Sequence, residues 1–299
     1  MLDFITVVFQ DELPLLEIQA RSFDEYLNPQ DVNQIIVVVN DNDTVADSIN
    51  CQWWGKYANR VLIKPRSEYN FTPSNNGWDD QQLLKLLSAA QSQTKWSLVF
   101  DAKTWLIKTL DTQESALFDT QGRPNVGRMH LSPHFESARV FVENYYGISI
   151  EMVLGPSGVP YVFHSEDVRE MLAGIPDFIN FFQQAQRNPT LVTEFVLYAG
   201  YIIKKYGSVE VIYNPNKLKI DPTQRTYINV ANLADWEVDN FDNFIETINN
   251  PATLTASIHR RTYQHLTQEQ LLTWVLFLEE HKLICNNLNT QKVLNTYIK

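Results

Sequence analysis

Residues 4–9 read FITVVF, a short run of apolar and mostly β-branched side chains. Such a run is typical of a strand in a parallel sheet, where helices cover both faces and every side chain is buried. Comparable runs recur along the N-terminal part of the chain: IIVVV at 35–39, RVLI at 60–63 and WSLVF at 96–100. The sequence therefore predicts that this part of the chain forms a buried sheet.

Helical patterns fill the intervals between these runs. Residues 12–27 and 78–87 space their apolar side chains as an amphipathic helix does, and residues 44–50 fit a short helix. Strands that alternate with helices over short connections indicate parallel pairing with right-handed crossovers. We therefore expect an α/β fold with a Rossmann-type, mainly parallel sheet flanked by helices.

The chain beyond residue 110 follows a less regular pattern. Residues 111–160 indicate loops and short strands, and residues 209–213 indicate a further strand. Helical spacing returns in three places: 166–173, 193–205 and the amphipathic stretch that starts at Thr267. Since no linker or internal repeat interrupts the chain, we expect a single domain over residues 1–299 with a helical C-terminal elaboration.

Composition and charge narrow the class of protein. The 299 residues carry 24 Lys and Arg against 35 Asp and Glu, a formal net charge of −11, which argues against a nucleic-acid partner because such a partner needs a basic surface. The hydrophobic fraction of 44% excludes a largely disordered chain. The start MLDFITVVFQDE lacks the basic region of a secretory signal, and no apolar run approaches the roughly 20 residues of a membrane span. We expect a cytoplasmic protein without a membrane span.

Polar side chains follow three of the predicted strands, at the point where each strand ends. Gln10 follows the first strand, Asp41 follows the second, and Asp101 comes directly after the fourth. Because ligands of open α/β sheets bind outside the carboxyl ends of the strands, these residues are candidates for a binding site. Asp41 also fits a turn or a helix cap, which is the more common role of Asp and Asn at such positions.

Several motifs of common enzyme classes are absent from the sequence. It contains no G-x-G-x-x-G and no G-x-x-x-x-G-K-[ST] run, which argues against a dinucleotide-binding fingerprint and a P-loop. The absence of G-x-S-x-G argues against a serine hydrolase on this sheet, and the six histidines show no zinc-ligand spacing.

A set of segments carries a resemblance to a known family. In order along the chain they are GWDDQQLLKLLSAA at 77–90, SLVFDAKTWLIK at 97–108, PYVFHSEDVREML at 160–172, TEFVLYAGYI at 193–202 and SIHRR at 257–261. Together they resemble an uncharacterised family of microbial and phage glycosyltransferase-like proteins with a GT-A fold, the fold of nucleotide-diphospho-sugar transferases.

The resemblance implies an activity and a division of roles along the chain. Residues 1–110 would form the nucleotide-sugar-binding half, and residues 111–299 the acceptor-side half with the C-terminal helices. The implied reaction moves a sugar from a nucleotide-diphosphate donor to a carbohydrate or another hydroxyl acceptor. Such a protein is expected in the bacterial cytoplasm, or in the host cytoplasm if a phage encodes it.

Enzymes of this kind often carry Asp-x-Asp after a strand, where two carboxylates suit the Mn²⁺ or Mg²⁺ that neutralises the diphosphate. Here the triplet is Asp101-Ala102-Lys103, so a cation replaces the second carboxylate. His259 resembles a C-terminal His that such enzymes place near the metal, and it also fits a surface residue. The alternatives are that Asp101 and His259 ligate Mn²⁺ or Mg²⁺, or that Lys103 contacts the diphosphate without a metal.

Further donor contacts are expected from the helix that precedes the fourth strand. Gln82 and Lys85 are three residues apart and share a helix face that could meet ribose, phosphate or sugar hydroxyls, although Gln and Lys also suit a solvated face. The expected donor-binding residues are Gln10, Asp41, Gln82, Lys85, Asp101, Lys103 and His259.

An inverting transferase needs a carboxylate base that takes a proton from the acceptor hydroxyl. Glu194, at the start of a predicted helix, is the first candidate and Asp167 is the second, with helix capping as the structural alternative for Asp167. Aromatic side chains can act as platforms for sugar rings, and we expect at most two of the following four at the site: Trp78, Trp105, Tyr161 and Tyr198.

A second class of function is compatible with the same residues. A non-catalytic carbohydrate- or nucleotide-binding protein could keep the GT-A fold, and Lys103 in place of the second carboxylate favours this alternative. A nucleotidyltransferase is disfavoured, because the segment FQDELPLL after the first strand contains no Gly-rich loop.

Overall fold

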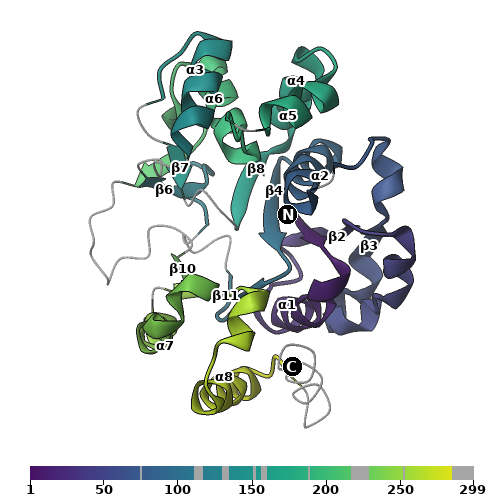
Figure 1. The fold of residues 1–299 in the computed structure, drawn as a ribbon, viewed down its shortest axis with the longest axis vertical. Helices are drawn as coiled ribbons and strands as arrows, with labels where there is room; N and C mark the ends of the chain where they lie inside the picture. Colours follow the sequence, from purple (N-terminus) through teal and green to yellow (C-terminus); the bar gives the residue numbers. More distant parts are fainter. Residues whose placement is uncertain are drawn as a thin grey trace.

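The molecule is built around a central sheet, seen in the computed structural model in Figure 1. The model describes residues 1–74, 76–110, 117–129, 135–150, 153–155, 160–187, 189–216, 229–251 and 253–284. The sheet has five strands in the order β3-β2-β1-β4-β8. Their bounds are Leu2–Val8 (β1), Val32–Val39 (β2), Val61–Lys64 (β3), Trp96–Asp101 (β4) and Tyr161–His164 (β8).

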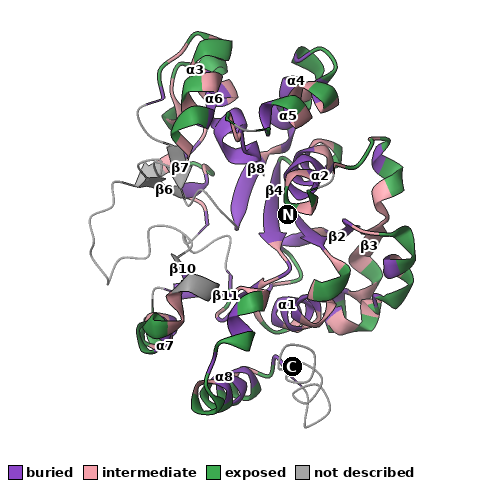
Figure 2. Ribbon diagram, viewed as in Figure 1, coloured by how far each residue is buried: buried purple, intermediate pink, exposed green. Residues whose placement is uncertain are grey.

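The pairing within this sheet is mainly parallel. β1 runs parallel to both β2 and β4, β2 runs parallel to β3, and only β8 is antiparallel to its neighbour β4. Every residue of β1 is buried, as expected of a strand covered on both faces, and Figure 2 shows the same for the middle of the sheet. The mainly parallel α/β fold expected from the sequence is confirmed.

Two helices cover the sheet from opposite faces. The first is α1 (Leu13–Tyr26), which follows the short 3₁₀ turn η1 (Gln10–Glu12), and the second is α2 (Gly77–Gln91). The α2 helix begins where the sequence supplies a cap, because the Asn76 side chain accepts a hydrogen bond from the Trp78 backbone N–H. Three further 3₁₀ segments complete this part: η2 (Asp43–Ser48), η3 (Cys51–Arg60) and η4 (Arg66–Tyr69).

The strand order reverses at β1, which creates a crevice. The chain leaves β1 toward β2 on one side and returns to pair with β1 as β4 on the other side. The register sets Val7 of β1 opposite Asp101 of β4, so the two strands end at nearly the same level. In doubly wound sheets, ligands bind outside the carboxyl ends of the strands at such a reversal point.

A second sheet begins within three residues of Asp101. The chain turns at Ala102 and Lys103 and enters β5 (Thr104–Leu106), which leaves the central sheet and pairs antiparallel with β11 (Thr253–Ile258); β11 in turn pairs with β10 (Asn229–Leu233). The register of β5 against β11 sets Thr104 opposite Ser257. This pairing carries the residues after β11 to the mouth of the crevice.

The C-terminal part has its own core beneath that second sheet. Trp105 and Trp274 are both fully buried and their rings lie 5.5 Å apart. The elements around them are η7 (Asp235–Asn240), α7 (Phe241–Asn249), η8 (Arg260–Gln264) and α8 (Gln268–Glu280). The expected C-terminal elaboration is therefore present, and it combines helices with a small sheet.

The rest of the second half packs beyond β8. A third sheet has the order β7-β6-β9. Helix α6 contacts this sheet and α3 packs on α6, while α4, α5 and α6 contact α2 (Figure 1). The bounds are Asn125–Met129 (β6), Val153–Gly155 (β7), Asn214–Asn216 (β9), Glu136–Tyr146 (α3), Ser165–Gly174 (α4), Phe178–Ala185 (α5) and Glu194–Tyr206 (α6).

Two local predictions for this half were wrong. Residues 111–160 contain the helix α3, which buries only Ala138 and Val142 and so gives a weak apolar pattern in the sequence. The strand expected at 209–213 is the 3₁₀ turn η6 (Val209–Val211), where the Ser208 side chain accepts a hydrogen bond from the Glu210 backbone N–H. A serine cap of this kind competes with strand pairing. The described helices include none with the length and apolar character to cross a membrane.

Candidate active site

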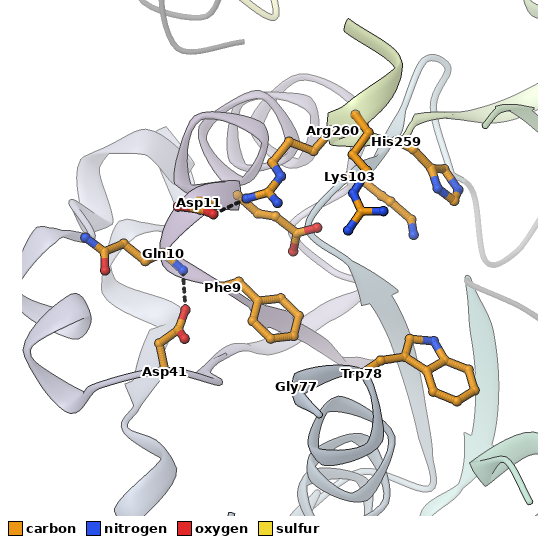
Figure 3. A pocket seen from close by; sticks show the side chains of 11 residues that line it. Phe9, Gln10, Asp11, Asp41, Gly77, Trp78, Lys103, His259 and Arg260 are labelled. Atoms are coloured by element: carbon orange, nitrogen blue, oxygen red, sulfur yellow. Dashed lines mark hydrogen bonds and ion pairs between the residues drawn. The ribbon is translucent and has the colours of Figure 1, made fainter. Parts of the chain in front are cut away.

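A pocket of about 540 Å³ lies at the carboxyl ends of the central strands. This volume falls within the range of sites that hold small molecules, roughly 300–1,000 Å³. Figure 3 shows its lining, which comes from the ends of β1 and β2, the start of α2, the turn after β4 and the segment after β11. The lining residues are Phe9, Gln10, Asp11, Glu12, Asp41, Gly77, Trp78, Lys103, His259, Arg260 and Arg261.

Basic side chains gather on one side of this pocket. Lys103 lines it from the turn between β4 and β5, and His259, Arg260 and Arg261 line it from the segment after β11. Figure 3 shows Lys103, His259 and Arg260. The Arg260 guanidinium forms an ion pair with Asp11, which ties this segment to the end of β1. The antiparallel pairing of β5 with β11 thus brings residues from distant parts of the sequence together as a basic wall, formed by Lys103, His259, Arg260 and Arg261.

The opposite side of the pocket carries hydrogen-bonding groups. The Gln10 backbone N–H donates to Asp41 Oδ2 over 2.6 Å, so the Asp41 carboxylate joins the ends of β1 and β2. Figure 3 shows Gln10 and Asp41 on the side of Phe9 that lies away from Lys103 and His259. The pocket therefore has two chemically different ends.

Two aromatic side chains also line the pocket: Phe9 lies between those ends, and Trp78 lies on the side of Lys103 and His259 (Figure 3). The Phe9 ring packs on Gly77, where a Cβ atom would lie only 2.6 Å from Phe9 Cε1, so the ring lies closer than any larger residue would allow. Trp78 is 45% exposed and lines the pocket, whereas Trp105, Tyr161 and Tyr198 are buried. Of the four expected sugar platforms, only Trp78 is among the residues that line the described pocket.

Asp101 lies behind Lys103 and is held by two lysines. Its Oδ1 atom lies 2.8 Å from Lys85 Nζ and accepts a hydrogen bond of 2.8 Å from Gln81 Nε2, while Oδ2 lies 3.5 Å from Lys103 Nζ. Burial raises the pKa of Asp101, but the charges of Lys85 and Lys103 outweigh it and lower the pKa to about 2. Asp101 is therefore an ionised carboxylate that fixes Lys103 at the pocket.

Lys85 joins Asp101 to Glu194 in a buried ion triad. Lys85 Nζ lies 3.2 Å from Glu194 Oε1, and the side chains of Lys85 and Glu194 are 6% and 2% exposed. Burial lowers the pKa of Lys85, yet Asp101 and Glu194 together hold it above its usual value. For Glu194, burial raises the pKa and the charge of Lys85 only partly opposes this.

The two candidate bases lie outside the pocket lining. Glu194 faces Lys85, and Asp167 is fully buried at the first turn of α4, where its Oδ1 atom accepts hydrogen bonds from Lys205 Nζ (2.7 Å) and the Tyr206 hydroxyl (2.9 Å). The Asp167 Oδ2 atom lies 2.8 Å from His164 Nδ1. Burial raises the pKa of Asp167, and its contacts with His164, Lys205 and Tyr206 lower it below the usual range. Their assignment as bases stays a prediction.

The helix α2 contacts Asp101 through Gln81 and Lys85, and not through the expected pair of Gln82 and Lys85. Gln81, rather than Gln82, donates to Asp101. Gln82 is 2% exposed, and neither polar atom of its side chain has a hydrogen-bond partner in the described structure. Gln82 is not among the lining residues, so its role in donor binding also stays a prediction.

Glu12 is a pocket residue that sequence reasoning did not select. Its Oε2 atom is buried without a hydrogen-bond partner among the described residues. Burial is the main cause that raises the pKa of Glu12 to about 7, with the Asp101 charge adding to it and Lys103 and Arg260 opposing it. Glu12 therefore changes its charge in the neutral range.

A divalent cation does not fit the side chains around Asp101. Both Asp101 oxygens face lysine ammonium groups, and a cation, Lys103, stands where a second carboxylate ligand would be needed. Among the residues that the structure describes, no three His, Cys, Asp or Glu side chains are grouped so that they could hold a metal ion. The expectation that Asp101 and His259 ligate Mn²⁺ or Mg²⁺ thus finds no matching donor set here.

The sequence belongs to a defined family. Residues 5–247 match the model of a family of unknown function, DUF6492, and the chain is a member of it. The expectation of an uncharacterised family is confirmed. No curated protein matches the sequence.

The fold is similar to those of solved glycosyltransferases. The galactosyltransferase LgtC in complex with donor and acceptor sugar analogs matches with 10% identity and a TM-score of 0.49, over 98% of this chain and 100% of that one. The glycosyltransferase GlyE of Streptococcus pneumoniae TIGR4, in its apo form, matches with 11% identity and a TM-score of 0.45, over 98% and 62%. The bifunctional glycosyltransferase WbbM matches with 8% identity and a TM-score of 0.45, over 99% and 51%.

The structure adds lining residues that local sequence patterns had not selected. Arg260 and Arg261 directly follow His259, so their position in the sequence was the available signal. Phe9 and Gly77 carry no chemical signal of their own and are found only through their contact. Of the expected donor-binding residues, Gln10, Asp41, Lys103 and His259 line the pocket, and Lys85 and Asp101 lie behind Lys103.

Proposed function

We propose that the protein is a glycosyltransferase that binds a nucleotide-diphosphate sugar in this pocket. The observation that carries the proposal is the two-ended lining at the crevice of the central sheet. Lys103 and His259 lie on one side of Phe9, Gln10 and Asp41 lie on the other, and Arg260 and Arg261 also line the pocket. A nucleotide sugar has the same division, with two ionised phosphates and a neutral nucleoside that forms hydrogen bonds.

The fit extends to the aromatic residues. A diphosphate beside the basic wall would be bound by charge-assisted hydrogen bonds, the strongest that side chains form. The nucleoside would lie toward Asp41 across Phe9, and the sugar would lie toward the exposed ring of Trp78. Aromatic faces of this kind bind the apolar faces of sugars and bases while leaving polar edges for hydrogen bonds.

The transfer itself breaks one bond and forms another. The bond between the anomeric carbon and the phosphate oxygen breaks, and its electron pair leaves with the nucleoside diphosphate. The acceptor hydroxyl oxygen bonds to the anomeric carbon and loses its proton to a base. Cations that already face the leaving group stabilise the charge that develops on it, because they need no reorganisation during the reaction. Glu194 and Asp167 remain the proposed bases, with the geometry described above.

Calorimetric titration with UDP-, GDP- and CDP-sugars tests the proposal. We expect one of these donors to bind with the sugar contributing to affinity, and we expect slow release of the nucleoside diphosphate when hydroxyl acceptors are supplied. Donor binding without release of the nucleoside diphosphate, whichever acceptor is supplied, would favour the non-catalytic binding protein. Absence of binding to all three donors would contradict the proposed glycosyltransferase function.

Glu12 should make donor binding pH-dependent. Its pKa of about 7 means that the pocket gains a negative charge as pH rises through neutrality, and this charge repels the diphosphate. We expect the affinity for a nucleotide sugar to fall about 3- to 10-fold from about pH 6 to about pH 8. The diphosphate of a nucleotide sugar stays fully ionised over this range, so the ligand does not contribute.

The variant Glu12→Gln provides the comparison for this prediction. Glutamine keeps the shape of the protonated carboxyl and does not ionise, so the variant should lose most of the pH dependence and keep the affinity of the wild type at low pH. Any pH dependence left in the variant would come from other titratable groups and would not be assigned to Glu12. An unchanged pH profile in Glu12→Gln would contradict the role of Glu12.

A further inference from the structure

The charges around Asp101 point to a specific way of binding the diphosphate. Lys103 Nζ lies 3.5 Å from Asp101 Oδ2 and lines the pocket, so one ammonium group faces both the half-buried Asp101 carboxylate and the ligand site. We propose that the pocket holds the diphosphate directly with Lys103 and Arg261, and that this binding needs no divalent cation. The inference rests on the proposed function and specifies the chemistry of the same site.

The buried triad makes Asp101 a poor ligand for a metal ion. Its Oδ1 atom is shared by Lys85 and Gln81 at 2.8 Å each, and Oδ2 faces Lys103. A metal ion at Asp101 would have to displace Lys85 or lie beside two ammonium groups. Displacing Lys85 would leave Glu194, which is 2% exposed, as a buried carboxylate without its counter-charge, and such a state is strongly unfavourable.

The basic wall supplies the charge that a metal would otherwise bring. The two ionised phosphates of a nucleotide sugar carry two negative charges. Lys103, in the turn between β4 and β5, and Arg261, in η8 after β11, carry two positive charges. Arg261 is exposed and has no ion-pair partner among the described residues, whereas Arg260 is engaged with Asp11. A guanidinium also matches two phosphate oxygens at once, which a lysine cannot do.

Binding measured by calorimetry in EDTA and in Mn²⁺ tests this inference without relying on turnover. The probes are the nucleotide sugar that binds best and inorganic pyrophosphate. We expect the wild-type affinity for both probes to agree within about threefold between the two conditions. A nucleotide sugar that binds only with Mn²⁺ would overturn the metal-free site and leave the proposed donor intact.

Two substitutions at residue 103 sharpen the result. Lys103→Gln should weaken binding of both probes in EDTA about 10- to 100-fold, because it removes one charge-assisted contact. Lys103→Asp should weaken binding in EDTA at least as much and regain affinity on addition of Mn²⁺, because it creates two carboxylates at the spacing that hard cations bind. Lys204→Gln, an exposed lysine on α6, is the matched control and should bind as the wild type does.

The outcomes separate this inference from the proposed function. Pyrophosphate binding in EDTA that depends on Lys103, with no nucleotide sugar bound, would support the metal-free anion site and refute the proposed donor. Equal affinities of Lys103→Gln and the wild type would overturn the inference even if nucleotide sugars bind. Failure of both probes under both conditions would overturn the inference and the proposed function together.

Discussion

Replacing Lys85 with methionine is expected to lower the free energy of unfolding by about 3–5 kcal/mol, because the change removes the central cation of a buried ion triad. Methionine fills a similar volume, so the loss reports the charge and not a cavity. Asp101 would keep Lys103 and Gln81, but Glu194 would remain buried without a counter-charge. Urea unfolding followed by circular dichroism measures the effect.

The pH dependence of this variant identifies the residue responsible. Burial already raises the pKa of Glu194, and loss of Lys85 raises it further. A carboxyl whose pKa is higher in the folded than in the unfolded state binds more protons when folded, so stability falls as pH rises through that pKa. The deficit of Lys85→Met should therefore shrink from about pH 8 to about pH 5.

Two further variants serve as controls for the triad. Lys204→Met changes an exposed lysine at the end of α6 and should cost less than about 1 kcal/mol. Adding Glu194→Gln to Lys85→Met removes the buried charge and should restore at least about 1 kcal/mol. A cost of Lys85→Met no larger than that of Lys204→Met would mean that the triad is not buried in solution.

The double variant Arg260→Gln/Arg261→Gln is expected to lose about 100-fold in affinity for a nucleotide sugar. Loss of Arg261 removes its charge-assisted hydrogen bonds to the phosphates, each worth about 1.5–3 kcal/mol, and loss of Arg260 removes the ion pair with Asp11 that ties this segment to the end of β1. Stability should change little, because the Arg260 side chain is 35% exposed and that of its partner Asp11 is 70% exposed. Calorimetric titration measures the affinity, and thermal unfolding checks the fold.

A variant with the same loss of charge elsewhere controls for long-range electrostatics. Arg187→Gln/Lys204→Gln also removes two positive charges, from exposed residues that do not line the pocket. Its affinity should stay close to that of the wild type at physiological salt, where distant charges are screened. An equal loss in both double variants would indicate a general field effect and would remove the two arginines from the binding site.

The central fold was predictable because its signal is local. The run at residues 4–9 became the fully buried strand β1, and the helix predicted over residues 12–27 became η1 and α1. Apolar periodicity reports whether each segment is buried on one face or two, and that information is contained in neighbouring residues. The helix α3 was not predicted, because it buries few side chains and its apolar periodicity is therefore weak.

The site was only partly predictable. Asp101 was selected because it directly follows an apolar strand, and Lys103 because it replaces the second carboxylate of the Asp-x-Asp triplet that the resemblance implies. Lys103 is among the residues that line the described pocket. Glu12 and Arg261 were not selected, since a carboxylate in a short turn and an exposed arginine carry no distinctive pattern. Their significance depends on burial and on neighbours, which no spacing rule supplies.

The alternation of strands and helices, and the strand end at Asp101, follow from the local order of apolar and polar residues. The tertiary structure alone decided which charges meet there: Lys85 reaches Glu194 across 109 residues, and the pairing of β5 with β11 brings Arg260 and Arg261 to Lys103. The physical reason is that the pattern of apolar and polar residues is a local property of the sequence. Ion pairs and pocket walls depend instead on strand order and register. Those are set by the packing of the whole chain.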